Sequence, residues 1–193
     1  MVHRTDTRQR MLDTAAELFQ TQGYHATGLN QLVSAGGAPK GSLYFHFPGG
    51  KEQIAAEALQ LSGVQLRDAL KALVTGAPDT ASGIEAVVNA LAQSLLDSDF
   101  QRGCPLATVA LDVGSESELI RQSCVDGYDS WHDVLAEYLV GQGLTAEKAA
   151  DLSTIVLASI EGGLLLAKTK KDIAPLRAIA VHLRATVESE LNR

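Results

Sequence analysis

Residues 29 to 47 of the chain read Leu29-Asn-Gln-Leu-Val-Ser-Ala-Gly-Gly-Ala-Pro-Lys-Gly-Ser-Leu-Tyr-Phe-His-Phe47. Leu29, Leu32 and Val33 follow the i, i+3, i+4 spacing of a helix with one buried face. Two glycines come next, and glycine adopts the positive φ of a tight turn without steric cost. The pattern predicts a short helix that ends in a glycine turn.

A second short helix is predicted after the turn. Pro39 suits its first turn, because the proline ring holds φ near the helical value and lacks an N–H that would have no intrahelical partner. Gly41 costs a helix interior about 1 kcal/mol relative to alanine, and close approach to another molecule would explain its presence. The exposed face offers groups that suit phosphates or base edges, namely Lys40, Gly41, Ser42, Tyr44 and His46. This layout predicts a helix-turn-helix, which is typical of DNA-binding proteins.

The charge of the chain is divided unevenly. The net charge is −7 at pH 7. Residues 1 to 51 hold five Lys or Arg and three Asp or Glu, a balance of +2, whereas residues 52 to 193 hold eleven and twenty, a balance of −9. Only the segment that contacts phosphates needs an excess of positive charge. A basic N-terminal segment that also contains the helix-turn-helix pattern supports a modular DNA-binding protein.

Composition predicts a chain that folds without a metal or a cofactor, because 193 residues of 46% hydrophobic composition can bury a sizeable core. Cys104 and Cys124 lack the spacing of a zinc site or a redox motif, so two reduced thiols are expected. The N-terminus is polar, and no apolar run approaches the roughly 20 residues of a membrane span. We therefore expect a soluble, cytoplasmic protein with no membrane partner.

Helical periodicity recurs along the whole chain, and no long segment alternates as a strand does. The predicted fold class is all-α. We expect a DNA-binding head at residues 1–50 and a regulatory body at residues 51–193, whose first helix, 51–74, connects the two. The other helices are expected at about 6–22, with Gly23 at its end, and at about 116–140, 146–168 and 173–191. A further helix is expected to hold Ile84, Val87, Val88, Leu91 and Leu95, and a short apolar segment follows at 106–113.

The penultimate helix is apolar nearly all round between Ile155 and Ala167. Such a helix must be covered on every side, and in a chain of this size a second copy is the best candidate for the cover. The last helix also has one apolar face. We therefore predict a homodimer whose interface contains Leu157, Ile160, Leu164, Leu176, Ile179, Leu183 and Val187.

The head also matches a known pattern, in Thr27, Leu32, Ala35-Gly36, Gly41, Leu43-Tyr44, His46-Phe47 and Lys51-Glu52. With these residues the chain resembles the TetR family of bacterial transcriptional repressors over residues 5–55. The segment from Gly37 to Lys51, with Gly103-Cys104-Pro105, is similar to the LmrA/YxaF-like branch. The resemblance implies a three-helix DNA-binding head, a long fourth helix, and an all-α body that binds a ligand and dimerises through its last two helices.

The resemblance further implies which residues contact DNA. Family members use the positions of Thr27, Tyr44, His46 and Lys51 on phosphates, and those of Lys40, Gly41 and Ser42 near base edges. A lysine in the first turn of a helix opposes the helix dipole, so a nearby phosphate explains Lys51 better than helix stability does. Phe47 is expected to anchor the second short helix, and Tyr44 to bury its ring with its hydroxyl outward. His46 as an ordinary surface histidine remains an alternative.

Two positions depart from the family pattern. Gly28 replaces a common Ser or Thr at the start of the first short helix, so Thr27 must cap that helix if any side chain does. The connection Pro48-Gly49-Gly50 is one residue longer than the commoner family loop, which affects the reach of Lys51.

A repressor of this type would bind a small, apolar or aromatic effector among the body helices. The candidate ligand-binding residues are Phe100, Cys104, Leu106, Tyr128, Trp131 and His132. Because an aromatic stripe at helical spacing is more often core than pocket, each of these also has a structural interpretation. Nothing in the sequence lowers the pKa of the Cys104 thiol, which argues against an oxidant sensor.

The predicted function is a homodimeric, ligand-responsive repressor of a palindromic double-stranded operator. A transcriptional activator on the same fold is one alternative, and an all-α small-molecule carrier that does not bind DNA is another. An enzyme that uses Cys104 with His132 is disfavoured, because no third residue to orient the histidine and no oxyanion motif is evident.

Overall fold

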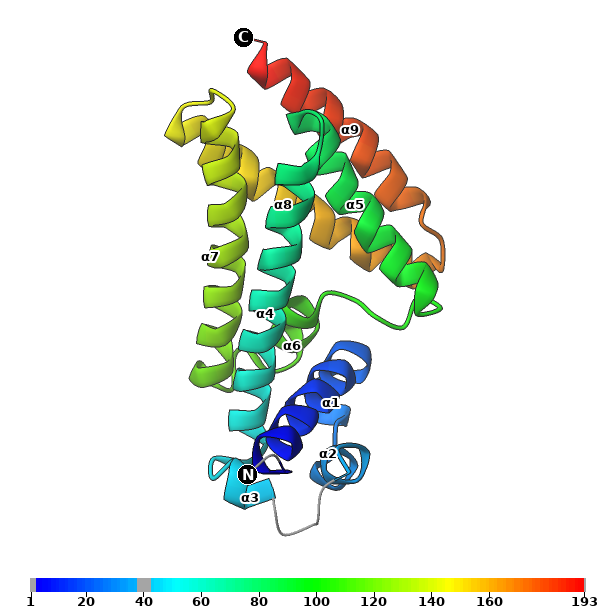
Figure 1. The fold of residues 1–193 in the computed structure, drawn as a ribbon. Coiled ribbons are helices and arrows are strands. Elements are labelled where there is room, and N and C mark those ends of the chain that lie inside the picture. Colours follow the sequence, from blue (N-terminus) through cyan, green and yellow to red (C-terminus); the bar gives the residue numbers. More distant parts are fainter. Residues whose placement is uncertain (1–2, 38–42, 193) are drawn as a thin grey trace. The chain divides into compact units, whose positions relative to one another are not determined.

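The computed structural model describes residues 3–37 and 43–192, and every regular element in these ranges is a helix (Figure 1). The all-α prediction is confirmed. The helices are α1 His3–Ala26, α2 Leu29–Ala35, α3 Leu43–His46, α4 Gly50–Gly76, α5 Thr80–Asp97, α6 Pro105–Val113, α7 Glu118–Gly141, α8 Ala146–Lys170 and α9 Ala174–Leu191.

The chain forms two compact units. The first contains Met1–Val64 and Cys104–Tyr128, and the second contains Gln65–Gly103 and Asp129–Arg193. Helices α4 and α7 each begin in the first unit and end in the second. The N-terminal helices therefore share their unit with α6 and the first half of α7.

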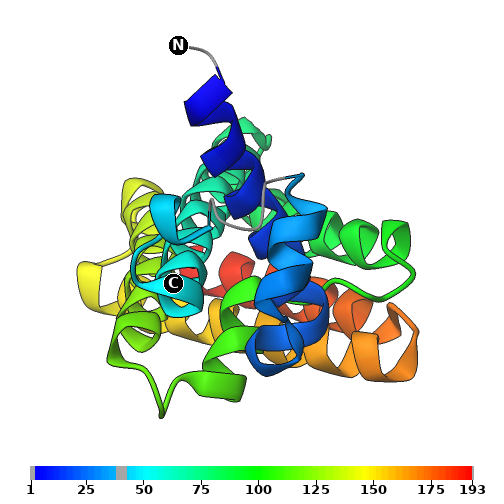
Figure 2. The same ribbon diagram turned by 90° about the horizontal axis from the view of Figure 1, so that it is seen from below.

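In the first unit, α1 packs against both α2 and α6, and Figure 2 shows these helices from below. The contact with α2 is tight, because a Cβ at Gly36 would lie 3.0 Å from Met11 Cγ. The buried side chains of this unit are mostly apolar, and their burial removes apolar surface from water. The largest of them are Met11, Phe19, Leu32, Leu43, Phe47, Ile54, Leu59, Leu106 and Ile120.

Helix α1 does not stop where the sequence analysis placed its end. Its helical hydrogen bonding resumes after Gly23 and continues to Ala26, but Gly23 itself has φ 83° and ψ 177°. A break of this kind is available to glycine because it lacks a Cβ. The glycine marks a sharp kink before the last residues of the helix.

In the second unit, α9 packs against both α5 and α8. Helices α8 and α9 approach closely at Gly163, where a Cβ would lie 2.5 Å from Ile179 Cδ1 and 2.9 Å from Leu176 Cδ2. Glycine at this position lets the two backbones come together while the larger side chains of α9 fill the space. The crossing is thus formed within a single chain.

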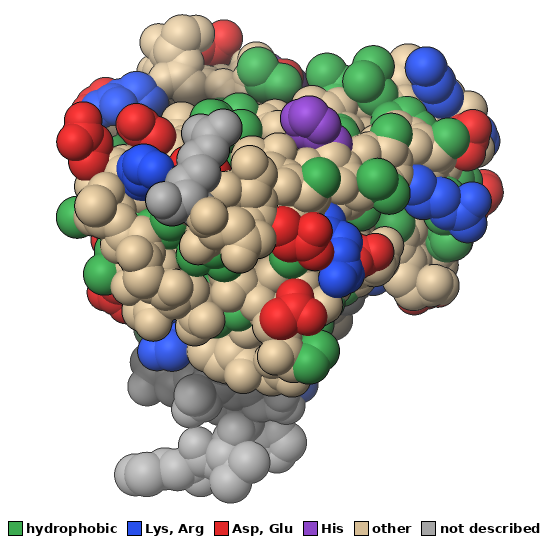
Figure 3. Space-filling model, turned by 90° about the horizontal axis from the view of Figure 1, so that it is seen from above, with side chains coloured by type: hydrophobic (Ala, Val, Ile, Leu, Met, Phe, Trp, Pro, Cys, Tyr) green, Lys and Arg blue, Asp and Glu red, His purple; other side chains and the backbone are tan. Residues whose placement is uncertain are grey.

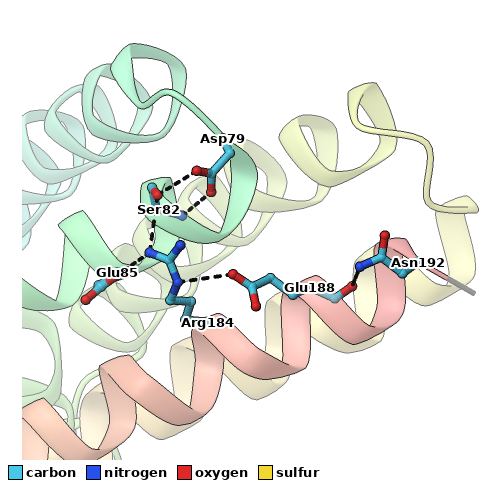
Figure 4. Close-up of polar contacts among 6 residues, drawn as sticks. All are labelled: Asp79, Ser82, Glu85, Arg184, Glu188 and Asn192. Atoms are coloured by element: carbon cyan, nitrogen blue, oxygen red, sulfur yellow. Dashed lines mark hydrogen bonds and ion pairs between the residues drawn. The ribbon is translucent and has the colours of Figure 1, made fainter.

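A cluster of polar groups joins α9 to the first turns of α5 (Figure 4). Asp79 caps α5, accepting a hydrogen bond from the Ser82 N–H at 2.7 Å, and the bonds from Ser82 lower the pKa of its carboxyl. Arg184 of α9 donates to Glu85 Oε2 at 2.7 Å and to Ser82 Oγ at 3.3 Å. Its Nε also lies 3.1 Å from Glu188 Oε1. One guanidinium therefore connects two helices.

Helix α8 is more apolar than the sequence analysis allowed. Its most apolar 18 residues have a mean hydropathy of 1.5, enough by length and composition alone for a membrane span. Core helices of soluble proteins meet the same criterion. One side of α8 does pack inside the second unit, where Leu152, Val156, Ile160, Leu164 and Ala167 are buried.

Candidate nucleic-acid interface

Helix α3 is held in place by two buried side chains. Leu43 begins the helix and Phe47 follows its last residue, four positions later, and both side chains are almost completely buried. The guanidinium of Arg8 lies 4.8 Å from the centre of the Phe47 ring and also pairs with Glu57 of α4. The expectation that Phe47 anchors this helix is confirmed.

The opposite side of α3 exposes two aromatic rings. Tyr44 is 61% exposed and Phe45 is 58% exposed, while His46 is half-buried against its aromatic neighbours. The prediction that Tyr44 buries its ring is wrong. Leu43 and Phe47 occupy the inward side, so Tyr44 and Phe45 lie on the outward side. Phe45 was not predicted as an interface residue, although its place between the two anchors already indicated an outward ring.

Thr27 lies inside the turn between α1 and α2. It is 0% exposed, and its Oγ1 donates to the Gly23 carbonyl at 2.7 Å and accepts from Gln22 Nε2 at 3.0 Å. The first residue flanking α2 is Gly28, and no side chain caps the helix. Thr27 is therefore not the cap that the sequence analysis allowed for; it closes the preceding turn instead.

Lys51, in the first turn of α4, lies over an aromatic ring. Its Nζ is 4.2 Å from the centre of the Tyr24 ring, a cation–π distance. Burial lowers the pKa of Lys51, and the Asp112 carboxylate opposes this effect. The pKa of Tyr24 is raised by burial and then by the negative charges of Glu52 and Glu116. The expected phosphate anchor thus lies among carboxylates.

The residues expected at base edges, Lys40, Gly41 and Ser42, lie outside the described residues, as does Pro39. Their roles stay predictions.

Three of the expected ligand-binding residues belong to the first unit. Cys104 caps α6 through a 3.5 Å contact from the Ala107 N–H, and its Sγ lies 3.7 Å from Tyr128 Oη. Leu106 is fully buried, in the space that Gly127 leaves open, where a Cβ would lie 2.6 Å from Leu106 Cδ1. The structure therefore brings Cys104 and Tyr128 together and gives Leu106 a packing role.

The other cysteine is an inert part of the same core. Burial raises the pKa of Cys124 to about 11, and its Sγ lies 3.8 Å from the Leu106 carbonyl oxygen. A thiol in this environment remains protonated and unreactive near neutral pH.

The remaining three expected ligand-binding residues belong to the second unit. Trp131 is buried and Phe100 is half-buried in a left-handed backbone conformation with φ 59°. His132 Nε2 lies 3.0 Å from the Ala150 carbonyl oxygen, so its ring joins α7 to α8. His132 thereby has a structural contact that the sequence did not reveal.

Most residues expected at the dimer interface are buried within the single chain. Ile160, Leu164, Leu176, Leu183 and Val187 are buried, and Leu157 and Ile179 are half-buried. Other apolar side chains of the same two helices are exposed. They are Ile155, Leu165 and Leu166 of α8 and Val181 of α9. Figure 3, drawn from above, shows hydrophobic side chains reaching the surface among charged ones.

Comparison with known proteins identifies the family of this chain. The profile for the bacterial regulatory proteins of the tetR family matches residues 11–58, and the profile described as "Transcriptional regulator LmrA/YxaF-like, C-terminal domain" matches residues 80–182. The chain belongs to the TetR family of transcriptional regulators. Within the TetR family, the second match assigns it to the LmrA/YxaF-like group, so its function is regulatory and not enzymatic.

Individual TetR-family members support this assignment along the full length. The HTH-type transcriptional regulator LmrA of Bacillus subtilis is 38% identical over 97% of this chain and 98% of its own. YxaF, another regulator of the same organism, is 37% identical over 98% of this chain and 100% of its own. The crystal structure of a TetR regulator from Legionella pneumophila has the same fold, with a TM-score of 0.84 at 21% identity over 96% of this chain and 98% of its own.

Proposed function

We propose that the chain is a homodimeric repressor that a small molecule releases from a palindromic operator. The observation that carries the proposal is α3, whose two buried anchors leave Tyr44 and Phe45 exposed within the segment of the TetR-family match. Two large rings that stay this exposed add little to the buried core of the chain. Contact with DNA accounts for their exposure.

The proposed head is residues 1–50, and residues 51–193 form the regulatory body, connected through the helix that begins near Lys51. Tyr44 and His46 of the head and Lys51, the first residue of the body, contact phosphates, and the residues at 40–42 approach base edges. Lys51 must leave the Tyr24 ring to reach a phosphate, and an ammonium on a flexible four-carbon stem allows this. Thr27 supports the phosphate site from inside the turn.

Two copies are proposed to meet through α8 and α9. The support is the exposed apolar set on these helices, Ile155, Leu165, Leu166 and Val181. Removing these side chains from water favours association, at roughly 25 cal/mol for each Å² of apolar surface. A partner helix also explains why α8 is apolar on the side that the single chain leaves uncovered. This arrangement suits a soluble, cytoplasmic protein.

The proposed effector is apolar or aromatic, and the contact of Cys104 with Tyr128 is the best-supported part of its site. An effector that binds more tightly to the form released from DNA shifts the population toward that form. Phe100, Leu106, Trp131 and His132 are candidates for further contacts.

A gel-shift titration against the promoters next to the gene of this chain tests the proposal. We expect a specific shift at low salt that weakens steeply as salt rises, because phosphate contacts release counterions. No shift with any neighbouring promoter at low salt would support the alternative of a small-molecule carrier. A reporter gene whose expression falls when the regulator is deleted would support an activator.

A further inference from the structure

The turn between α1 and α2 depends on a glycine backbone. Gly23 has φ 83° and ψ 177°, a combination that is almost exclusive to glycine. The Thr27 hydroxyl donates to the Gly23 carbonyl, and the Thr27 N–H donates to the Tyr24 carbonyl at 3.1 Å. Because α2 begins at Leu29, this turn sets the position from which the helix-turn-helix departs.

A carboxylate of α6 binds the same turn. Asp112 Oδ2 accepts a hydrogen bond from the His25 backbone N–H at 2.8 Å. The same oxygen lies 3.0 Å from the position of a Cβ at Gly23, so it occupies the space that glycine leaves open. Helices α1 and α6 pack together in the first unit. The carboxylate therefore ties the turn to the last turn of α6.

Local helix stability does not explain Asp112. The residue lies next to the C-terminal end of α6, where the helix dipole disfavours negative charge. The side chain is exposed, so it fills no gap in the core. What the carboxylate gains is a charge-assisted hydrogen bond, which is stronger than a neutral one.

Other ionisable side chains lie near the same turn. His25 Nε2 is 3.5 Å from Glu116 Oε2, in the loop that follows α6. Lys51 lies over the Tyr24 ring, and the negative charge of Asp112 acts to raise the pKa of its ammonium group. One end of α6 thus contacts the backbone of the turn and also faces the lysine proposed to bind a phosphate.

We propose that Asp112 is a positioning residue for DNA binding. The inference rests on the proposed function of the head. Asp112 acts through the His25 N–H, which fixes the turn before α2, and through that turn it places α2 and α3 for the major groove.

Two substitutions separate the hydrogen bond from the charge. Asp112→Asn keeps an oxygen acceptor for the His25 N–H, whereas Asp112→Ala removes it. We expect Asp112→Ala to weaken operator binding about tenfold, the usual effect of losing a hydrogen bond to a charged group. Binding to non-operator DNA is not weakened, because a negative charge near Lys51 is removed. Amide exchange at His25, followed by NMR in the DNA-free protein, becomes faster in Asp112→Ala and changes little in Asp112→Asn.

Asp126→Ala is the matched control, since it removes one exposed carboxylate from α7 in the same unit. It should leave the operator affinity and the exchange of His25 unchanged. The inference is overturned if Asp112→Ala behaves like this control, or if its affinities for operator and non-operator DNA fall together. Failure of the proposed function is distinguishable, because the unsubstituted chain would then bind no operator.

Discussion

Two surfaces of this chain expose apolar side chains, and they differ in what lies beneath them. On α3, Tyr44 and Phe45 stand on a short helix held by Leu43 and Phe47. On α8 and α9, exposed aliphatic side chains such as Leu165 and Val181 stand on long helices already packed against each other. Aromatic rings beside hydrogen-bond donors, as on α3, suit a polar, anionic partner. Aliphatic side chains, as on α8 and α9, suit a second apolar surface. Exposure alone therefore does not identify the partner.

The largest expected effect tests the anchors beneath the first surface. Phe47→Ala should lower the free energy of unfolding by about 3–5 kcal/mol, because a fully buried ring is lost and a cavity remains. Tyr44→Ala should change the same quantity by less than about 0.5 kcal/mol and weaken DNA binding instead. Urea titration and gel shifts measure the two effects. If Tyr44→Ala destabilised the fold as strongly as Phe47→Ala, the contrast within α3 would be lost.

Introducing negative charge on α8 and α9 tests whether the second surface forms the dimer interface. Leu165→Asp combined with Val181→Asp should raise the dimer dissociation constant on the order of 100-fold, because an unpaired buried carboxylate is costly. Analytical ultracentrifugation measures the dissociation constant, and operator affinity should fall with it. Leu111→Asp, which changes an exposed residue of α6, serves as the control and should leave the dimer dissociation constant unchanged. A dimer that persists in the double variant would remove α8 and α9 from the interface.

A smaller effect concerns the turn that supports the first surface. Gly23→Ala should lower the free energy of unfolding by about 1–3 kcal/mol, because the alanine Cβ opposes this backbone conformation. Gly28→Ala is a close control, since a Cβ there meets nothing within 4 Å and φ is −86°. Thermal unfolding compares the two variants. Equal stability of both would show that the turn tolerates a side chain.

The smallest expected effect concerns the polar connection beneath the second surface. Arg184→Ala should lower the free energy of unfolding by less than Gly23→Ala does, because its ion pairs with Glu85 and Glu188 are partly exposed and screened by water. Urea titration at low and high salt measures the contribution, which should shrink as salt rises. A loss larger than that of Gly23→Ala would mean that Arg184 decides how α9 packs on α5.

Much of the fold was predictable because helices depend on local patterns. The ends of α4 and of α7 to α9 lie within a few residues of the predicted ones, since apolar spacing and the breaks at Gly and Pro act over one or two turns. The site was less predictable. Phe47 was assigned correctly from its apolar character, but Tyr44 was given a buried ring that it does not have. Thr27 and His132 make hydrogen bonds to backbone carbonyls that no sequence pattern encodes.

The two short helices around Gly36 and Gly37 follow from the sequence alone, because turns and helix spacing are local properties. The order of the helices and the family follow in the same way. Which apolar face is covered depends on tertiary packing. Leu176 and Val181 are alike in sequence terms, yet one is buried against Gly163 and the other is exposed. The contact of Asp112 with the His25 N–H joins positions 87 residues apart, and only the packing of α6 on α1 brings them together.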